Sequence, residues 1–152
     1  MKVKEIMVKD VASISPETGC SEALDLLEKM QISGLPIIDE NGKLVGMFTE
    51  KDVLSYILPS YIEKVGGFIY EENPKSTKKK FMELNKIKVR QLMRKDVVTT
   101  TEDTTLCEIA RVMLTQKARR IPVVDKSGKV VGIVARCDIL KAFAKEAGKS
   151  IT

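Results

Sequence analysis

The chain contains its own sequence twice, displaced by 86 residues. Shifting the sequence by that distance aligns Val3–Ser55 with Val89–Lys141 without a gap, and 15 of the 53 aligned positions are identical. The shared positions include turn glycines such as Gly42 and Gly128. A gapless repeat of this kind indicates a duplicated structural unit, and a unit of about 53 residues has too thin a core to stand alone.

Each copy has the residue pattern of a β-α-β-β-α unit. A β-rich run comes first ("DVASIS" or "DVVTTT"), and apolar residues then recur at helical spacing after a start signal such as Thr105 and Glu108. A strand led by Pro36 or Pro122 and a second strand, joined by a short glycine-containing turn, predict a hairpin. A closing helix begins at Thr49 or Ala135. The predicted fold is α+β, with the two repeats packed sheet to sheet around a pseudo-twofold axis.

The segment between the copies is too long for an ordinary loop. Pro59 and the pair Gly66-Gly67 predict a helix extension followed by a turn, and a second helix is expected from about Ser76 to Asn85. We interpret Lys78–Lys80 as a solvated helix face, with a nucleic-acid contact as the alternative, although no aromatic residues are interleaved to stack on bases. The expected domains are a first repeat over 1–56, a helical linker over 57–88, a second repeat over 89–145 and a tail over 146–152.

The composition removes several classes of function. The sequence has no histidine, which excludes histidine general bases, Ser-His or Cys-His pairs and histidine metal sites. Cys20, Cys107 and Cys137 lack CxxC spacing, so we interpret them as small buried or half-buried side chains. No apolar run reaches the roughly 20 residues of a membrane span, and the N-terminus has no apolar signal segment. These features predict a non-catalytic protein of the cytoplasm.

The repeated pattern of a proline-led apolar strand, an aspartate, a Gly-Lys turn and then "VG" before Thr/Ala-x-x-Asp resembles the cystathionine-β-synthase (CBS) domain. Two copies in tandem resemble a Bateman module, and the resemblance covers nearly the whole chain outside the linker. It implies a regulatory module that binds an adenosine nucleotide (AMP, ADP or ATP), or S-adenosylmethionine, in a cleft between the repeats. It also implies a homodimer and a regulated partner protein of unknown identity. No cofactor is implied, and Mg²⁺ beside the phosphates of ATP is left open.

In this family the segment that corresponds to "GMFTEKD" holds the ribose, which here implies Thr49 and Asp52. A carboxylate accepts hydrogen bonds from both vicinal ribose hydroxyls, and positions i and i+3 share one side of a first helical turn. The same spacing is that of a capping box, so a plain helix cap is the alternative. The second copy retains Asp138 but has Ala135. Because Ala135 cannot cap, we interpret the retained Asp138 as half of a weaker ribose site.

The resemblance also implies positions for the rest of the ligand. Arg119 and Arg120 stand where the family places phosphate-binding residues, and across the twofold they would reach a nucleotide whose ribose lies on Asp52. Lys51 and Arg136 are secondary phosphate candidates. The adenine pocket is implied at Ala12, Ile32, Ser33, Gly34 and Leu35, with ordinary core packing as the alternative for Ile32 and Leu35.

Three other functions compete with a nucleotide sensor. An enzyme acting on nucleotides has against it the missing histidine, the missing P-loop and the missing pair of carboxylates. A nucleic-acid-binding protein is suggested by the net charge of +5, and it predicts binding that weakens steeply with salt. A structural dimerisation module would have an empty cleft.

Overall fold

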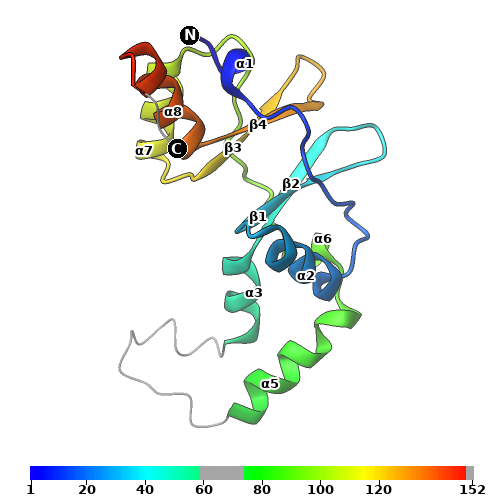
Figure 1. The fold of residues 1–152 in the computed structure, drawn as a ribbon. Helices are drawn as coiled ribbons and strands as arrows, with labels where there is room; N and C mark the ends of the chain where they lie inside the picture. Colours follow the sequence, from blue (N-terminus) through cyan, green and yellow to red (C-terminus); the bar gives the residue numbers. More distant parts are fainter. Residues whose placement is uncertain (59–73, 150–152) are drawn as a thin grey trace. The chain divides into compact units, whose positions relative to one another are not determined.

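The structure is a computed structural model that describes residues 1–58 and 74–149 (Figure 1). Its helices are α1 (Val3–Ile6), α2 (Cys20–Met30), α3 (Glu50–Ile57), α5 (Pro74–Met82), η1 (a 3₁₀ helix, Glu83–Lys86), α6 (Val89–Leu92), α7 (Leu106–Thr115) and α8 (Arg136–Glu146). Its strands are β1 (Gly34–Ile38), β2 (Leu44–Thr49), β3 (Arg120–Val124) and β4 (Val130–Ala135). Each repeat has one two-stranded sheet with helices, which confirms the α+β class.

The two predicted hairpins are present, and an aspartate closes each turn. Gly42 and Gly128 adopt φ angles of 81° and 87°, a left-handed conformation that glycine reaches without strain. Asp39 Oδ1 accepts the N–H groups of Asn41 and Lys43 at 2.8 and 3.0 Å. Asp125 makes the equivalent bonds, and the hydroxyl of Ser127 is the main reason that the pKa of Asp125 is lowered.

Two details of the predicted strands are wrong, and both trace to proline. The hairpin strands begin at Gly34 and Arg120, two residues before Pro36 and Pro122. The β-rich runs are not strands, because each forms only one parallel bridge, as in Thr100 N–H to Pro122 O at 3.0 Å and Val124 N–H to Thr100 O at 2.9 Å. The next bond of a parallel ladder would need an N–H from Pro122, which proline lacks.

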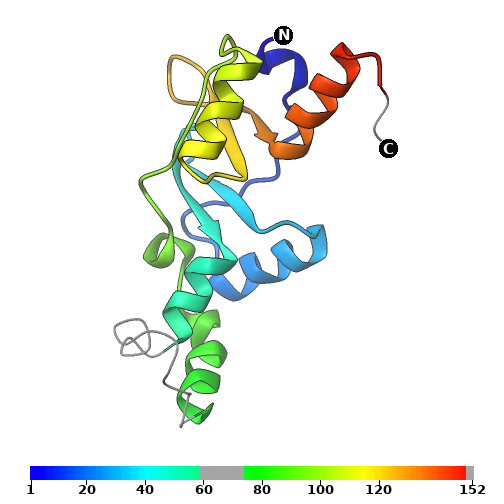
Figure 2. The same cartoon turned by 90° about the vertical axis from the view of Figure 1, so that its left-hand side faces the viewer.

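The helices fall close to their predicted ranges. Thr105 is the N-cap of α7 and accepts the N–H of Glu108 at 3.3 Å. The helix expected from about Ser76 to Asn85 is present as α5 followed by η1, which ends at Lys86. The predicted turn at Gly66-Gly67 lies outside the described residues. Figure 2 shows α3 and α5 side by side, and Lys80 Nζ lies 5.5 Å from the ring centre of Tyr56. Among residues 1–58 and 74–149, no helix is long and apolar enough to cross a membrane.

The cysteine prediction is right for Cys20 and wrong for Cys107 and Cys137. Cys20 is buried, and burial raises the pKa of its thiol to about 11. Cys107 and Cys137 are exposed, which differs from the expectation. Each is the second residue of its helix, and its side chain points away from the core. The buried residues of these helices include Leu106 in α7 and Ile139 in α8.

The chain forms two compact units, and these units are not the two repeats. Unit 1 combines Met1–Ala12 and Ile38–Leu44 with the chain from Asp96 onward, and unit 2 combines Ser13–Ile37 with Val45–Lys95. The opening segment of each repeat therefore lies in the unit formed mainly by the other repeat. The domain boundaries expected from the sequence follow the duplication and stay a prediction for the folded chain.

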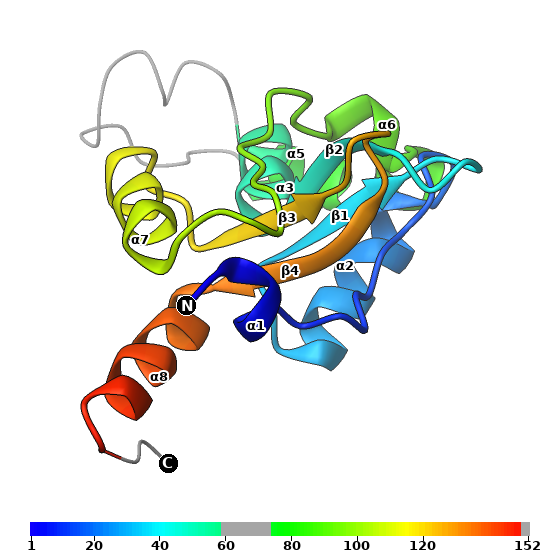
Figure 3. The same ribbon diagram turned by 90° about the horizontal axis from the view of Figure 1, so that it is seen from above.

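In unit 1, the segment Met1–Val8 is built into the second repeat. The N–H of Val3 donates to Thr104 O at 2.9 Å, and Val3 is fully buried. Val8 and Ile133 exchange two backbone hydrogen bonds of 2.9 Å, which attaches a third short chain segment to the hairpin of β3 and β4. Figure 3 shows the α1 ribbon beside β4 and near α8.

Unit 2 shows the same contacts displaced by 86 residues. The N–H of Val89 donates to Thr18 O at 2.8 Å, and Val89 is also fully buried. Met47 and Arg94 exchange two backbone hydrogen bonds of 2.9 Å. Each repeat therefore contributes its opening segment (the exchanged segment) to the unit formed mainly by the other repeat, and the segment completes the core of that unit.

Two glycines allow the exchanged segments to approach the hairpins. A Cβ atom on Gly46 would lie 2.8 Å from Met93 Sδ and 2.9 Å from Arg94 O. A Cβ atom on Gly132 would lie 2.6 Å from Met7 Sδ and 2.9 Å from Met7 Cγ. These distances are too short for any side chain larger than hydrogen, so the repeated glycines and methionines are complementary packing partners.

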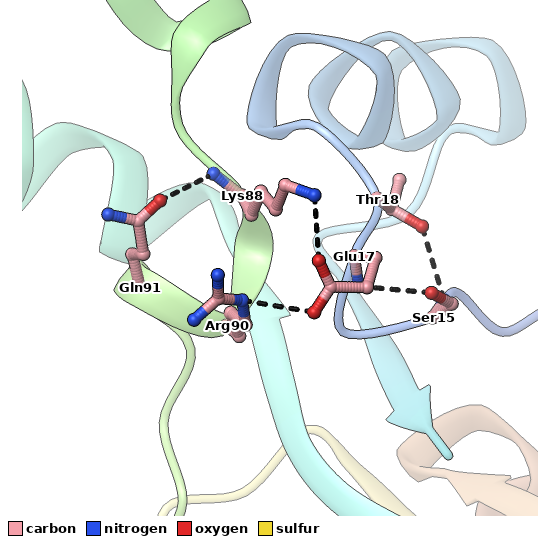
Figure 4. A network of polar contacts seen from close by, with 6 residues as sticks. All are labelled: Ser15, Glu17, Thr18, Lys88, Arg90 and Gln91. Carbon is pink, nitrogen blue, oxygen red and sulfur yellow. Dashed lines mark hydrogen bonds and ion pairs between the residues drawn. The ribbon is translucent and has the colours of Figure 1, made fainter. Parts of the chain in front are cut away.

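Ion pairs fasten each exchanged segment at its outer surface. In unit 2, Glu17 meets Lys88 Nζ at 2.7 Å and Arg90 Nε at 3.1 Å (Figure 4). In unit 1, the equivalent Asp103 meets Lys2 and Lys4, each at 3.7 Å. One carboxylate thus holds two cations of the exchanged segment in both units.

We expect the Glu17 ion pairs to make stability depend on pH. The hydrogen bond from Lys88 is the main reason that the pKa of Glu17 lies below its ordinary value of 4.5. Because its pKa is lowered, the Glu17 carboxylate contributes to the free energy of unfolding above pH 4.5. This contribution is lost as the pH falls through the folded-state pKa. The difference in urea midpoint between wild type and Glu17→Gln should therefore be small at pH 6, where water screens this exposed pair, and should shrink further as the pH falls below 4.5. A constant difference over this range, or the same behaviour in the exposed control Glu40→Gln, would contradict this.

Candidate functional site

The closing helix of the first repeat begins with the predicted capping box. The N–H and the hydroxyl of Thr49 both donate to Asp52 Oδ2 at 2.9 Å, and Thr49 Oγ1 accepts the N–H of Asp52 at 3.3 Å. Both side chains are half-buried. The cap alternative is therefore real, and these residues stabilise α3 whether or not they bind a ligand.

In the second repeat, half of the capping box persists without a hydroxyl. Asp138 Oδ2 accepts the N–H of Ala135 at 2.8 Å. Our inference that a cap without threonine would leave Asp138 with little to do is therefore wrong. The two hydrogen bonds of a capping box are independent, because the carboxylate serves the backbone of the N-cap residue whatever its side chain.

The two helix starts have the same surroundings in the two units. The N–H of Glu50 donates to Ser33 O at 3.1 Å in unit 2, and the N–H of Arg136 donates to Arg119 O at 3.2 Å in unit 1. Each start thus lies against the residue that precedes the first strand of its hairpin. The family resemblance implied one site for Ser33 and Thr49, which lie together in unit 2, but it assigned Arg119 to a nucleotide on Asp52, whereas Arg119 lies beside the start of α8 in unit 1.

Most of the adenine candidates lie near Thr49. Ser33 and Ile32 are half-buried, while Leu35 is 1% exposed, so the core alternative fits Leu35. A Cβ atom on Gly34 would lie 3.1 Å from Thr49 Cγ2, so the neighbouring strand already uses the close approach that this glycine permits. Ala12 is assigned to unit 1 and the other four candidates to unit 2.

The phosphate candidates divide between the units. Arg119, Arg120 and Arg136 belong to unit 1 together with Asp138, and Lys51 belongs to unit 2. Arg136 Nε donates to Ala118 O at 3.3 Å, which holds this guanidinium beside the segment that leads into β3. Arg119 is exposed and precedes β3, and Arg120 is half-buried at the first position of that strand.

A metal site is absent from the described part of the chain. Within residues 1–58 and 74–149, no three or more cysteine or carboxylate side chains gather so that they could hold a metal ion. Lys78 and Lys79 are exposed, whereas Lys80 donates to Tyr56 O at 3.4 Å. The described residues thus offer ligand chemistry at the two helix starts: a carboxylate, backbone N–H groups and, in unit 1, guanidinium groups.

The chain is similar in sequence to several known proteins over most of its length. The chain is 31% identical over 160 residues to the uncharacterized protein MJ1426 of Methanocaldococcus jannaschii, covering 94% of this chain and 91% of that protein. It is 33% identical over 140 residues to an inosine-5'-monophosphate dehydrogenase of the same organism, covering 92% of this chain but only 23% of the dehydrogenase. The likeness to the enzyme therefore concerns a minor part of it.

Two solved structures share the fold and contain ligands. The CBSX2 protein of Arabidopsis thaliana, in complex with AMP, has a TM-score of 0.74 and 28% identity, over 96% of this chain and 98% of that one. The CBS domain pair of protein MJ0100, in complex with 5′-methylthioadenosine and S-adenosyl-L-methionine, has a TM-score of 0.68 and 29% identity, over 96% and 98%. The CBS domain model matches residues 3–59 and 89–145. With both repeats matched and the fold shared, the chain belongs to the CBS domain family as a tandem pair.

Proposed function

We propose that this chain is a non-catalytic regulatory module that binds adenosine nucleotides through Asp52 and Asp138. The observation that carries this proposal is how each aspartate uses its two oxygens. Oδ2 of Asp52 accepts both the N–H and the hydroxyl of Thr49, and Oδ2 of Asp138 accepts the N–H of Ala135, while Oδ1 of Asp138 meets only the weak thiol donor of Cys137 at 3.9 Å. The other oxygen of each half-buried carboxylate can accept hydroxyl groups of a ribose, so capping and binding do not compete.

The surroundings of each carboxylate suit an adenosine ligand. The positive end of the helix dipole of α3 or α8 lies beside it and favours an anionic group, while the N–H groups of Glu50 and Arg136 already donate to Ser33 O and Arg119 O. Ser33 and Ile32 in unit 2 provide one polar and one apolar neighbour for a base. The AMP complex of CBSX2 and the adenosyl complex of MJ0100 show that proteins of this fold take such ligands.

Regulation would follow from ligand binding that favours one arrangement of the chain over another. A ligand shifts such an equilibrium only by its difference in affinity for the two states. The homodimer expected from the family stays a prediction. Leu54 and Leu140, which occupy equivalent positions on α3 and α8, are 54% and 62% exposed and are apolar side chains that a dimer would cover.

The test is thermal unfolding of the purified chain with AMP, ADP, ATP, S-adenosylmethionine and a GTP control. A ligand at a hundredfold excess over its Kd stabilises the folded state by about 2.7 kcal/mol. We expect an adenosine compound to raise the unfolding temperature, and we expect Asp52→Ala to reduce that rise. Asp52→Ala should also cost about 1 kcal/mol without ligand, because the cap is lost.

A matched variant separates binding from capping. Thr105→Ala removes the N-cap of α7, outside the candidate site, and should cost a similar amount of stability. It should leave the response to ligand intact. No rise with any adenosine compound, or equal loss of the rise in both variants, would leave Asp52 as a structural cap only.

A further inference from the structure

The two helix starts are equivalent in backbone but opposite in charge. Ser33, Gly34 and Glu50 of unit 2 correspond to Arg119, Arg120 and Arg136 of unit 1. Lys51 corresponds to an uncharged residue, Cys137, and the aspartate is common to both. The formal charge of these positions is therefore −1 in unit 2 and +2 in unit 1.

This difference lies at the end of each hairpin that leads into the closing helix of its repeat. Arg120 pairs with Ala135 at the base of the β3–β4 hairpin, directly before α8 begins. Arg136 is fixed there by its bond to Ala118 O, and its counterpart Glu50 is exposed at the first position of α3. Glu50 and Arg136 lie two residues before Asp52 and Asp138, in the same first helical turn as the carboxylate that would hold the ribose.

From these charges we infer that the two sites select different adenosine compounds: unit 1 binds a phosphorylated adenosine at Asp138, and unit 2 binds an adenosine compound without phosphate at Asp52. A phosphate group carries about −1.5 to −2 at neutral pH. Guanidinium groups match it in charge and geometry, whereas Glu50 beside Asp52 repels it. A neutral thioether or a cationic sulfonium is not repelled there, and Thr49 adds a hydroxyl that Ala135 lacks.

The inference rests on the proposed function, because it assigns ligands to the same two carboxylates. It differs from the expectation that the arginines serve a nucleotide on Asp52. A difference of three unit charges, partly screened by salt, should produce at least a tenfold preference in each site at low ionic strength.

Isothermal titration calorimetry with AMP and with 5′-methylthioadenosine tests the assignment on the full chain. We expect Asp138→Asn to weaken the binding of AMP at least tenfold and to leave the affinity for 5′-methylthioadenosine unchanged. We expect Asp52→Asn to weaken the binding of 5′-methylthioadenosine and to leave the affinity for AMP unchanged. Asparagine keeps an oxygen that can accept the N-cap N–H, so these variants should remain folded. Unfolding temperatures measured on the same samples check this.

A second set of variants exchanges the charged residues between the two sites and tests the charge argument directly. Giving unit 1 the residues of unit 2 (Arg119→Ser, Arg120→Gly and Arg136→Glu) should remove the preference of that site for AMP. Glu50→Arg should strengthen the binding of AMP at the Asp52 site. Lys126→Ser is the control, since it removes an exposed cation at the opposite end of the same hairpin and should change neither affinity.

The outcomes distinguish this inference from the proposed function. If substitution of one aspartate abolishes the binding of both compounds, or if Asp52→Asn abolishes the binding of AMP, the assignment of the two ligands to the two sites by charge is wrong. The proposed nucleotide binding then still stands. If neither compound binds the wild-type chain in calorimetry or in equilibrium dialysis, this inference is overturned, and the proposed function is overturned with it only if ADP, ATP and S-adenosylmethionine also fail to raise the unfolding temperature.

Discussion

Gly46→Ala should destabilise the protein by about 2–4 kcal/mol. The new methyl group would meet Met93 Sδ at 2.8 Å and the carbonyl oxygen of Arg94 at 2.9 Å. Overpacking of this kind costs about 1–3 kcal/mol, and displacing Arg94 also weakens its two hydrogen bonds to Met47. In a chain of this size the unfolding temperature should fall by roughly 5–15 °C.

The equivalent substitution Gly132→Ala should be easier to relieve. Its closest neighbours are the Sδ and Cγ atoms of Met7, while the nearest backbone atom, Val8 O, is 3.2 Å away. Met7→Ala should therefore restore part of the stability lost in Gly132→Ala, whereas Met93→Ala should restore less in Gly46→Ala, where a backbone oxygen stays in the way. Differential scanning calorimetry of the four variants measures both differences.

Gly19→Ala is the control for these variants. No heavy atom of the described residues lies within 4 Å of the position where its Cβ would be, and its φ of −68° suits alanine. Its unfolding temperature should change little. If Gly46→Ala were as mild as Gly19→Ala, or if neither methionine substitution restored stability, the close approach of the exchanged segments would not describe the folded chain.

The sequence predicted the elements that rest on local chemistry. The turn glycines, the aspartates that close the turns and the Thr49 and Thr105 caps all involve residues within four positions of one another. Such contacts have the same signature wherever the element lies in the fold. The β-rich runs failed as strands because their neighbours contain prolines, which is a property of the pairing partner and not of the runs themselves.

The exchange of opening segments could not be read from the repeat. Met7 is equivalent to Met93 and Gly46 to Gly132, so packing of Met7 on Gly46 within one repeat would leave the same pattern as packing of Met7 on Gly132. Duplication thus conceals which copy supplies a segment. The same symmetry obscured the candidate site: retention of Asp138 in the second repeat suggested ligand binding, but its hydrogen bond to Ala135 shows that capping is also a reason for the aspartate.

Separated repeats should not fold alone. A break between Gly66 and Gly67 lies outside the described residues and leaves each repeat intact in sequence. The first fragment would lose the segment with Leu84 and Val89, which are 1% and 0% exposed, and the second would lose fully buried Val3. Burying such a side chain stabilises a fold by about 1.5–3 kcal/mol, and each fragment also loses the backbone hydrogen bonds of its missing segment.

We expect neither fragment to show cooperative unfolding by circular dichroism, and we expect an equimolar mixture to regain it. In that mixture each fragment supplies the opening segment that the other requires, so the unfolding temperature should rise with concentration by mass action. Adding Gly132→Ala to the second fragment and Gly46→Ala to the first should weaken the association, because both substitutions obstruct the exchanged segments. Cooperative unfolding of either fragment alone, unaffected by its partner, would show that each repeat is complete in itself and that the exchange does not hold the chain together.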